Sequence, residues 1–474
     1  MSKTINILFL AAEAEPFIKV GGLGDVAGSL PRALRALSND DVTLDVRLVL
    51  PYHPALKADG LKPLGMFSLD RNGNELQVEV FETILNGMPV YLLNGEPIRA
   101  NGSVYSLDAK LDAEKYTFFS LAALELPKII NWFPDVIHGN DWHTALSMYG
   151  SLTKRWDEGA RKVASLITLH NLPFMGPDVS SILESYGVKL AQTDLPDWAR
   201  VMPLPLGLWA SDAIVAVSPT YAKEIRTPEY GCGLDEFLQF RHESVHGIVN
   251  GLDVDSFNPE VDSALGSNYN IATIEKRAAN KGLLQKRLGL SRELETPLLA
   301  VISRMDVQKG VDLAFRAFKS MKKSNWQAVI LGTGDPKLEE AAMNLQALFP
   351  EKIKVETRFD AELARQIYAS ADMLLMPSRY EPCGLSQMIA MRYGCVPIVR
   401  RVGGLNDTVQ HGVTGFVFEK IHHLSLVGAI KNAIKIFSDR EQWLSIQRAG
   451  MAQDFSWENS AKQYLELYQS ILRS

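Results

Sequence analysis

Residues 5–36 read INILFLAAEAEPFIKVGGLGDVAGSLPRALRA and predict the first strand, turn and helix of a doubly wound α/β domain. The apolar run Ile5–Leu10 has the composition of a strand that is buried in a parallel sheet. A glycine-rich stretch, Lys19–Asp25, follows this run, and a helical pattern opens near its end. Strand, glycine-rich turn and helix in this order form the first half of a βαβ unit.

The same alternation of strands and amphipathic helices continues along the chain. In the first half the further apolar, β-branched runs are Val46–Leu50, Val136–His138, Ala164–Leu169, Ala213–Val217 and His246–Val249. In the second half they are Leu298–Ser303, Ala328–Leu331, Ile353–Glu356, Met373–Pro377, Val396–Arg400 and Gly415–Phe418. Strands separated by helices in this way are typical of parallel sheets.

A break in composition divides the chain. The stretch after Asn250-Gly251 is rich in Asp, Asn, Ser and Pro, as connectors are. We therefore predict two Rossmann-like α/β domains, over residues 1–252 and 253–456, and a closing helix over residues 457–474. Ligands of open α/β sheets bind beyond the carboxyl ends of the strands, so we expect the site in the cleft between the domains.

Composition excludes several classes of partner. The 474 residues are 46% hydrophobic and 22% charged, with 49 Lys and Arg against 55 Asp and Glu, a net charge of −6. This balance and the absence of a basic tract exclude nucleic acids and anionic membranes as expected partners. Three scattered cysteines form no disulfide framework or zinc motif. We expect a cytoplasmic protein, or one of the plastid stroma if the source is a plant or alga.

The glycine-rich stretch is a candidate phosphate-binding loop. Gly21 and Gly22 allow the backbone to approach a ligand closely, and the helix that follows offers free N–H groups. A plain tight turn between strand and helix explains the glycines equally well. The stretch does not have the GxGxxG spacing of a dinucleotide fingerprint, and because Lys19 precedes the glycines it is not a P-loop.

Two loops in the second half carry charged residues at strand ends. Arg304 and Lys309 follow the run Leu298–Ser303 and could stabilise a diphosphate leaving group, although surface solvation is the usual fate of such residues. Glu381 follows the run Met373–Pro377 and could accept sugar hydroxyls. It could equally be a first-turn carboxylate that the helix dipole favours. The backbone N–H groups next to it, which could hold a phosphate, belong to Cys383, Gly384, Leu385 and Ser386.

Polar residues also follow several strands of the first half. They are Asp141, His170, Asn171 and Asn250. Any one of them could be structural. Because the carboxyl ends of parallel strands meet at one edge of the sheet, the group together forms a candidate site.

The chain resembles bacterial glycogen synthases and plant starch synthases, which transfer glucose from ADP-glucose. The resemblance covers nearly the whole chain, in order. It rests on KVGGLGDVAGSLPRAL (from Lys19), NDWHTAL (Asn140), TLHN (Thr168), VSPTYAKEI (Val217), GCGLDEFL (Gly231), IVNGLD (Ile248), NKGLLQKRLGL (Asn280), SRMDVQKG (Ser303), RYEPCGLSQMIAMRYGCVPIVRRVGGLNDTV (Arg379) and DFSWENSA (Asp454).

The resemblance implies the GT-B fold, with two Rossmann-like domains facing a cleft and a C-terminal helix that crosses back to the first domain. It implies retaining transfer of glucose to the non-reducing 4-OH of an α-1,4-glucan, glycogen or a maltooligosaccharide, with release of ADP. ADP-glucose is a substrate, and neither a cofactor nor a metal ion is expected.

The resemblance also implies roles for individual residues. The residues it implies in catalysis are Asp141, His170, Arg304, Lys309 and Glu381. The residues it implies at the donor are Lys19, Gly21, Gly22, Asn250, Arg304, Lys309, Phe359, Cys383, Gly384, Leu385 and Ser386. The residues it implies on the acceptor side are Asp25, Asp141, His170 and Asn171. Phe359 stands where the family has an adenine-stacking tyrosine, so we expect stacking to persist without the hydroxyl.

Two segments depart from the family pattern. Residues 173–176 read PFMG where the family has a Tyr-Gln-Gly ending, and residues 202–206, MPLPL, lack a family lysine. Both belong to the acceptor side and motivate an alternative, a related retaining transferase that uses another nucleotide sugar or a non-glucan acceptor. A third hypothesis, an inactive glucan-binding protein, is disfavoured because all five of these residues are intact: Lys19, His170, Arg304, Lys309 and Glu381.

Overall fold

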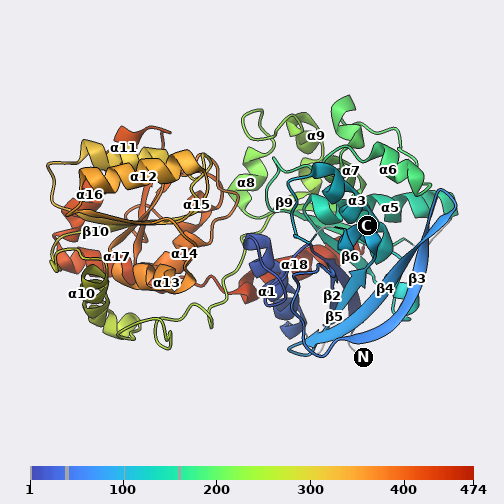
Figure 1. Cartoon of the computed structure of the whole chain (residues 1–474), viewed down its shortest axis with the longest axis horizontal. Coiled ribbons are helices and arrows are strands. Elements are labelled where there is room, and N and C mark those ends of the chain that lie inside the picture. Colours follow the sequence, from blue (N-terminus) through green and yellow to red (C-terminus); the bar gives the residue numbers. More distant parts are fainter. Residues whose placement is uncertain (1–2, 38–41, 101, 159–161, 474) are drawn as a thin grey trace. The chain divides into compact units, whose positions relative to one another are not determined.

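The computed structural model describes residues 3–37, 42–100, 102–158 and 162–473, and the chain forms two compact units. Unit 1 comprises Met1–Gly251 and Trp457–Ser474, and unit 2 comprises Leu252–Ser456. Each unit is built on a sheet of mainly parallel strands with helices between them (Figure 1). The predicted α/β fold class is therefore confirmed.

The described strands of unit 1 form one sheet in the order β3-β4-β5-β2-β1-β6-β7-β8-β9. They are β1 (Lys3–Leu10), β2 (Val42–Pro51), β3 (Lys62–Arg71), β4 (Asn74–Leu85), β5 (Met88–Asn94), β6 (Val136–Asn140), β7 (Ala164–Leu169), β8 (Ala213–Ala216) and β9 (Val245–Gly247). Neighbouring strands from β5 to β9 are parallel. Strands β6, β7 and β8 are buried along their whole length, as continuous apolar runs predict.

The strands at the antiparallel edge of this sheet are not among those predicted from the sequence. Strands β3, β4 and β5 pair antiparallel, and β3 is exposed along most of its length. An exposed strand needs no continuous apolar run, so the pattern that locates buried strands does not find it. The turns do carry a signal, because Asn72-Gly73 and Asn86-Gly87 adopt positive φ and close the two hairpins.

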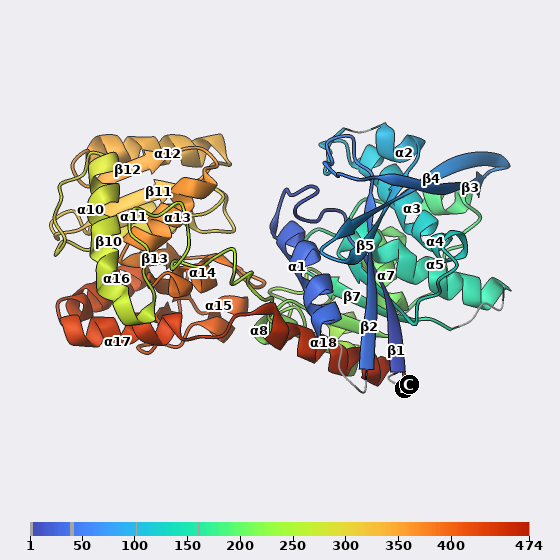
Figure 2. The same ribbon diagram turned by 90° about the horizontal axis from the view of Figure 1, so that it is seen from below.

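Helices cover both faces of the sheet of unit 1. They are α1 (Gly22–Ala36), α2 (Glu96–Arg99), α3 (Ala109–Ala123), α4 (Leu126–Ile129), α5 (Trp142–Glu158), α6 (Ser180–Ser185), η1 (Asp197–Val201), α7 (Pro203–Ala210), α8 (Pro219–Glu224), α9 (Asp235–Phe240), η2 (His242–Ser244) and α18 (Trp457–Ile471). Helices α3, α5 and α7 lie on one face, and α1 and α18 lie side by side on the other (Figure 2).

The C-terminal helix α18 packs into the core of unit 1, as predicted. Its buried face includes Tyr464 and Tyr468, which share one hydrophobic cluster with strand β1. His138 on β6 has Nδ1 2.7 Å from the Tyr468 hydroxyl and Nε2 2.8 Å from the Thr168 hydroxyl on β7. Helix α18 therefore supports β6 and β7 just before the strand ends that carry Asp141 and His170.

Unit 2 contains a parallel sheet in the order β12-β11-β10-β13-β14-β15. Its strands are β10 (Leu298–Ile302), β11 (Gln327–Leu331), β12 (Ile353–Glu356), β13 (Met373–Met376), β14 (Val396–Arg400) and β15 (Phe416–Phe418). Its helices are η3 (Ile271–Lys276), α10 (Arg277–Arg287), α11 (Val311–Ser320), α12 (Pro336–Leu348), α13 (Ala361–Ser370), α14 (Ser386–Arg392), α15 (Gly403–Thr408), α16 (His423–Phe437) and α17 (Arg440–Met451). Helices α11 and α12 cover one face of the sheet, and α13 and α14 cover the other (Figure 1).

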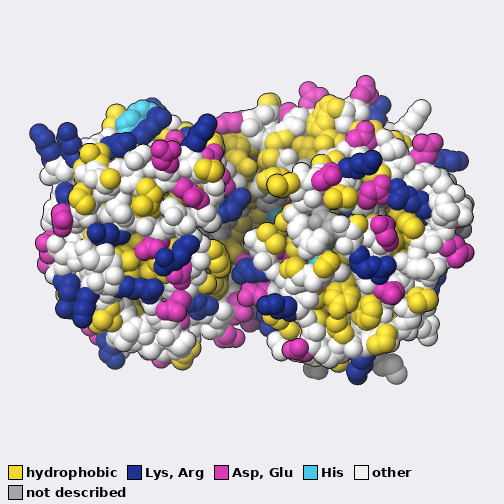
Figure 3. Space-filling view, viewed as in Figure 1, with side chains coloured by type: hydrophobic (Ala, Val, Ile, Leu, Met, Phe, Trp, Pro, Cys, Tyr) yellow, Lys and Arg dark blue, Asp and Glu magenta, His cyan; other side chains and the backbone are white. Residues whose placement is uncertain are grey.

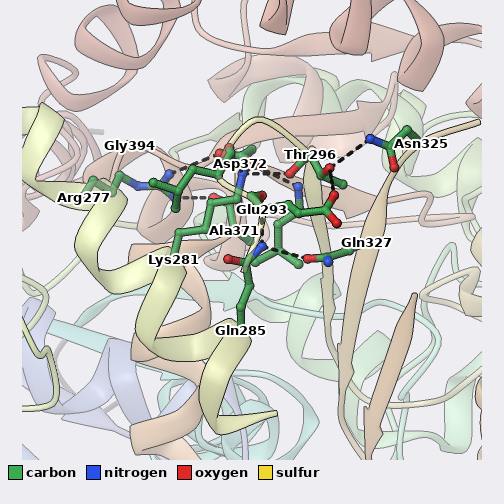
Figure 4. Close-up of polar contacts among 12 residues, drawn as sticks. Arg277, Lys281, Gln285, Glu293, Thr296, Asn325, Gln327, Ala371, Asp372 and Gly394 are labelled. Atoms are coloured by element: carbon green, nitrogen blue, oxygen red, sulfur yellow. Dashed lines mark hydrogen bonds and ion pairs between the residues drawn. The ribbon is translucent and has the colours of Figure 1, made fainter. Parts of the chain in front are cut away.

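A buried polar network fastens helix α10 to this sheet (Figure 4). The Nζ of Lys281 lies 2.7 Å from Oδ2 of Asp372, 2.6 Å from the carbonyl oxygen of Leu294 and 2.8 Å from that of Thr296. The same Asp372 oxygen accepts a hydrogen bond from the Leu298 amide at 2.8 Å. Lys281, in the motif that begins at Asn280, therefore forms a buried ion pair with Asp372 that joins α10 to the starts of β10 and β13.

Charged side chains of both signs are interspersed over the visible face of each unit (Figure 3). This distribution agrees with the small net charge of −6. None of the helices in the described part of the chain combines the length and the hydropathy that a membrane span requires.

Candidate active site

The loops predicted to carry chemistry follow the strands at which each sheet reverses its order. Strands β2 and β6 flank β1 in unit 1, and β11 and β13 flank β10 in unit 2. Such reversals open the crevices in which α/β sheets bind ligands. The loops in question are Lys19–Asp25 after β1, Asp141 after β6, Ser303–Gly310 after β10 and Pro377–Ser386 after β13.

The glycine loop, residues Lys19–Asp25, leads into α1. Gly21 is the N-cap of this helix, with an extended backbone and no side-chain cap. A Cβ added to Gly22 would meet no atom within 4 Å, so the space beside the first helical residue is open. Uncapped amides at the start of a helix favour an anion such as phosphate.

Lys19 belongs to a small ion cluster on the same loop. Its Nζ lies 2.9 Å from Oε2 of Glu15 and 2.6 Å from Oδ1 of Asp25. Asp25, which the resemblance implies on the acceptor side, thus contacts a residue implied at the donor. Burial raises the pKa of the Asp25 carboxyl. An incoming phosphate would have to share Lys19 with these two carboxylates.

Asp141 lies at the end of β6 with a φ of 54°. Its Oδ1 accepts a hydrogen bond from the His170 amide at 2.7 Å. Burial raises the pKa of the Asp141 carboxyl to about 7, although the amides of His170 and Asn171 favour its ionised form. Near neutral pH this carboxyl can therefore accept a hydrogen bond from a sugar hydroxyl or, when protonated, donate one.

His170 is oriented by Asn140, a residue that is not among those expected at the site. Its Nε2 lies 2.9 Å from Oδ1 of Asn140, whose own Nδ2 donates to the carbonyl oxygen of Leu10 at 2.9 Å. The amide oxygen of Asn140 must then accept, so His170 carries its proton on Nε2. Burial lowers the pKa of His170 to about 3, and the neutral ring keeps Nδ1 as an acceptor. The signal for Asn140 was its place immediately before Asp141.

Two asparagines of unit 1 carry acceptors without a partner. The side-chain oxygens of Asn171 and Asn250 are buried and accept no hydrogen bond from the described residues. A buried acceptor that lacks a donor costs free energy. Hydroxyl groups of a bound sugar could satisfy both oxygens.

Lys309 and Glu381 form a close ion pair in unit 2. The lysine Nζ lies 2.8 Å from both carboxylate oxygens of Glu381, and the Ser378 hydroxyl donates to one of them at 3.0 Å. Gly310 brings the two loops together, because a Cβ at this position, which has φ 64°, would lie 2.2 Å from the carbonyl oxygen of Pro377. Helix α14 has no acidic residue in its first turn, so the helix-dipole explanation of Glu381 does not hold.

Arg304 lies on the same loop as Lys309 but remains near the surface. Its Nη1 is 3.3 Å from Oδ2 of Asp306, and its side chain is 64% exposed. Most of the guanidinium is therefore open to an anion. Phe359 is 88% exposed, so its ring can stack on a planar base.

The segment Cys383–Ser386 leads into α14. Leu385 is the N-cap of this helix, and no side chain caps it. The side-chain amide of Gln387 donates to the carbonyl oxygens of Cys383 and Gly384, at 3.2 and 2.9 Å. These bonds fix the carbonyl groups of the segment.

The two segments that depart from the family pattern contact each other in unit 1. The Leu204 amide donates to the carbonyl oxygen of Met175 at 3.1 Å. Gly176 has φ 81°, and a Cβ there would lie 2.4 Å from Pro203 and 2.7 Å from Trp142. The two segments therefore pack as one layer beside Trp142, so changes in both can compensate for each other.

One cavity of unit 2, of about 330 Å³, lies apart from these residues between α10 and α13. Its lining includes Asn280, Arg287 and Gln366 and none of the predicted site residues. Among the described residues, no group of three or more His, Cys, Asp and Glu side chains is arranged to hold a metal ion.

Comparisons with known proteins match both units. Residues 6–240 match the starch synthase catalytic domain, and residues 287–448 match the glycosyl transferases group 1 family. The glycogen synthase of Streptococcus sanguinis is 38% identical, over 99% of this chain and 100% of that protein. The glycogen synthase of Clostridium perfringens is also 38% identical, over 99% of each chain.

Solved structures agree with these matches. The catalytic domain of starch synthase IV from Arabidopsis thaliana, bound to ADP and acarbose, has a TM-score of 0.89 and 32% identity, with full coverage of both chains. Sucrose-phosphate synthase from Thermosynechococcus elongatus, at 18% identity and a TM-score of 0.63 over 99% of each chain, shares the fold. The chain is therefore a glycosyltransferase of the GT-B fold and belongs to the family of glycogen and starch synthases.

Proposed function

We propose that this enzyme is a glucan synthase that transfers glucose from ADP-glucose to the non-reducing 4-OH of an α-1,4-glucan, with retention at the anomeric carbon. The observation that carries the proposal is the set of groups at the reversal points of the two sheets. Cations and uncapped helix amides suit a diphosphate, while neutral His170, Asp141 and unpartnered asparagine oxygens suit sugar hydroxyls.

Departure of ADP from the glucose places negative charge on the diphosphate. Lys309 and Arg304 would stabilise that charge, together with the amides of the glycine loop and of Cys383–Ser386. Lys309 is already held beside Glu381 at 2.8 Å, so it needs little reorganisation when the charge develops. Because these groups supply the stabilisation, we expect no metal requirement.

The sugar would be held mainly by hydrogen-bond acceptors, whereas cations and amides would hold the diphosphate. The Glu381 carboxylate, 2.8 Å from Lys309, would accept hydrogen bonds from hydroxyls of the transferred glucose. His170 and Asp141 would bind hydroxyls on the acceptor side, where the open oxygens of Asn171 and Asn250 offer further acceptors. Phe359 would stack on the adenine.

Retention fits a front-face displacement. The bond between the anomeric carbon and the diphosphate oxygen breaks, and the bond to the acceptor oxygen forms on the same face of the sugar. The proton of the acceptor hydroxyl passes to the departing phosphate oxygen, so no protein base is needed. A glycosyl ester on the enzyme, trapped by rapid acid quench and found by mass spectrometry, would overturn this mechanism.

Donor and acceptor assays test the proposed function directly. We expect purified protein to incorporate radiolabelled glucose from ADP-glucose, in preference to UDP-glucose, into glycogen and maltooligosaccharides, and to keep its rate in a chelator. Incorporation only into a small non-glucan acceptor would favour the related transferase suggested by residues 173–176 and 202–206. Glucan binding without any transfer would favour an inactive binding protein.

A further inference from the structure

Glu13 is a buried carboxylate to which the proposed mechanism gives no role. It is 1% exposed and lies between β1 and the glycine loop. The amides of Val20 and Gly21 donate to its oxygens, the second at 3.1 and 3.2 Å, and the Tyr105 hydroxyl donates to Oε1 at 3.0 Å. Burial raises the pKa of Tyr105 well above its usual value, so the phenol keeps the proton that it donates.

These contacts exclude a direct chemical role for Glu13. Both carboxylate oxygens already accept hydrogen bonds, and the side chain is closed to solvent. What the carboxylate does is fix the direction of two consecutive amides. The next residue, Gly22, begins α1, so the bonds to Glu13 determine how the uncapped helix start is presented.

Tyr105 is in turn held by a second buried group. Lys115 on α3 donates from Nζ to the carbonyl oxygens of Ser103 and Val104, at 3.0 and 2.8 Å, and its side chain is 0% exposed. The Tyr116 hydroxyl donates to the same Val104 oxygen at 2.6 Å. The backbone before Tyr105 is therefore fixed from α3, and buried polar contacts continue from α3 to the glycine loop.

We propose that Glu13, supported by Tyr105, is a positioning residue: by holding the amides of Val20 and Gly21 it orients the start of α1, where the amides from Gly22 face the donor diphosphate. The inference rests on the proposed function, since the loop matters only if it faces a diphosphate. Glu13 acts through the backbone of Val20 and Gly21 and does not touch the substrate. Its removal affects ligands that carry phosphates and spares those that do not.

The variants Glu13→Gln and Tyr105→Phe test this role. Glu13→Gln weakens charge-assisted bonds to neutral ones, and we expect the ADP-glucose KM and the ADP Kd to rise about tenfold. Tyr105→Phe removes one neutral donor, and we expect a rise of about threefold. The glucan KM and the binding of adenosine, which has no phosphate, remain within about twofold, because neither ligand presents a phosphate to the amides at the start of α1.

Two matched controls come from the same unit. Tyr186→Phe removes a buried hydroxyl that has no hydrogen-bond partner among the described residues, and Glu114→Gln neutralises a carboxylate paired with Arg71 at 2.8 Å. We expect both controls to keep the ADP Kd and the ADP-glucose KM of the wild type. If the ADP Kd and the ADP-glucose KM rose as much in the controls as in Glu13→Gln, the proposal would be overturned.

Hydrogen exchange of the ligand-free protein measures the loop without any substrate. We expect Glu13→Gln to accelerate exchange at Val20 and Gly21 while the strands of unit 1 keep their protection. Unchanged exchange at these two amides, or an unchanged ADP Kd, would overturn the inference. If the wild type binds ADP and transfers glucose but Glu13→Gln does so equally well, the inference alone fails. A wild type that neither binds ADP nor uses ADP-glucose refutes the proposed function instead.

Discussion

Replacing Lys309 with alanine tests the charge that the proposed mechanism places on departing ADP. The ammonium group lies 2.8 Å from Glu381 and its side chain is 20% exposed, so it is a fixed and largely desolvated donor. Loss of one preorganised donor of this kind lowers kcat by about 10²–10³, or about 3–4 kcal/mol. We expect a fall of that size in kcat and a smaller rise in the ADP-glucose KM, because the charge is greatest in the transition state.

The same substitution leaves a buried carboxylate without its cation. Ser378 then remains as a donor to Glu381 at 3.0 Å. Removing one partner of a fully buried pair costs about 3–5 kcal/mol, and partial exposure of Lys309 reduces the expected cost to about 1–3 kcal/mol. Urea unfolding of Lys309→Ala measures this loss, which must be kept separate from the loss of turnover.

A second variant separates the two effects. Lys309→Met combined with Glu381→Gln removes both charges, and we expect it to recover most of the stability but none of the turnover. Lys309→Arg keeps the charge and should retain part of the kcat. Turnover that is unchanged in Lys309→Ala, measured with saturating ADP-glucose and glycogen, would refute the assigned role. Recovery of kcat in the double variant would show that the lysine serves only to stabilise the fold.

Three further predictions concern the buried ion pair of Lys281, the pH dependence of stability, and the stacking of adenine on Phe359. Lys281→Ala should lower the free energy of unfolding by about 3–5 kcal/mol, because Asp372 stays buried without its cation. Urea titration measures this loss, and a loss below about 1 kcal/mol would contradict the prediction. Because burial raises the pKa of Asp141 to about 7, the folded state binds a proton that the unfolded state releases near pH 4. Stability from this group therefore falls as the pH rises from about 4 to about 7, by up to about 1.4 kcal/mol per pH unit. Asp141→Asn should remove that slope, and equal slopes for both proteins in unfolding titrations would count against the assignment. Phe359→Ala should raise the Kd of ADP by about tenfold through loss of stacking, with little change in the glucan KM. Calorimetry that finds the same ADP affinity for Phe359→Ala and the wild type would exclude the stacking role.

The sequence located the buried strands other than β5, and the loops that follow them. Continuous apolar runs such as Ala164–Leu169 mark strands covered on both faces, and helical spacing near the C-terminus marks α18. Strand β3 is mostly exposed, and β4 is buried only at separate positions such as Val78 and Val80, so neither carries such a run. The Asn-Gly turns mark these hairpins in the sequence instead. Residues at strand ends, including Lys309 and Glu381, could be selected because parallel topology brings those ends to one edge.

What sequence could not decide is which side chain contacts which. Lys309 and Glu381 are 72 residues apart, and their pairing depends on the close approach of two loops at Gly310. The hydrogen bond from His170 to Asn140 and the contacts of Glu13 with the glycine loop likewise join residues that no local pattern relates. Local composition determines strands, helices and turns, because each depends on neighbouring residues. Protonation states and partners depend on burial and on contacts distant in sequence, and only the tertiary structure determines those.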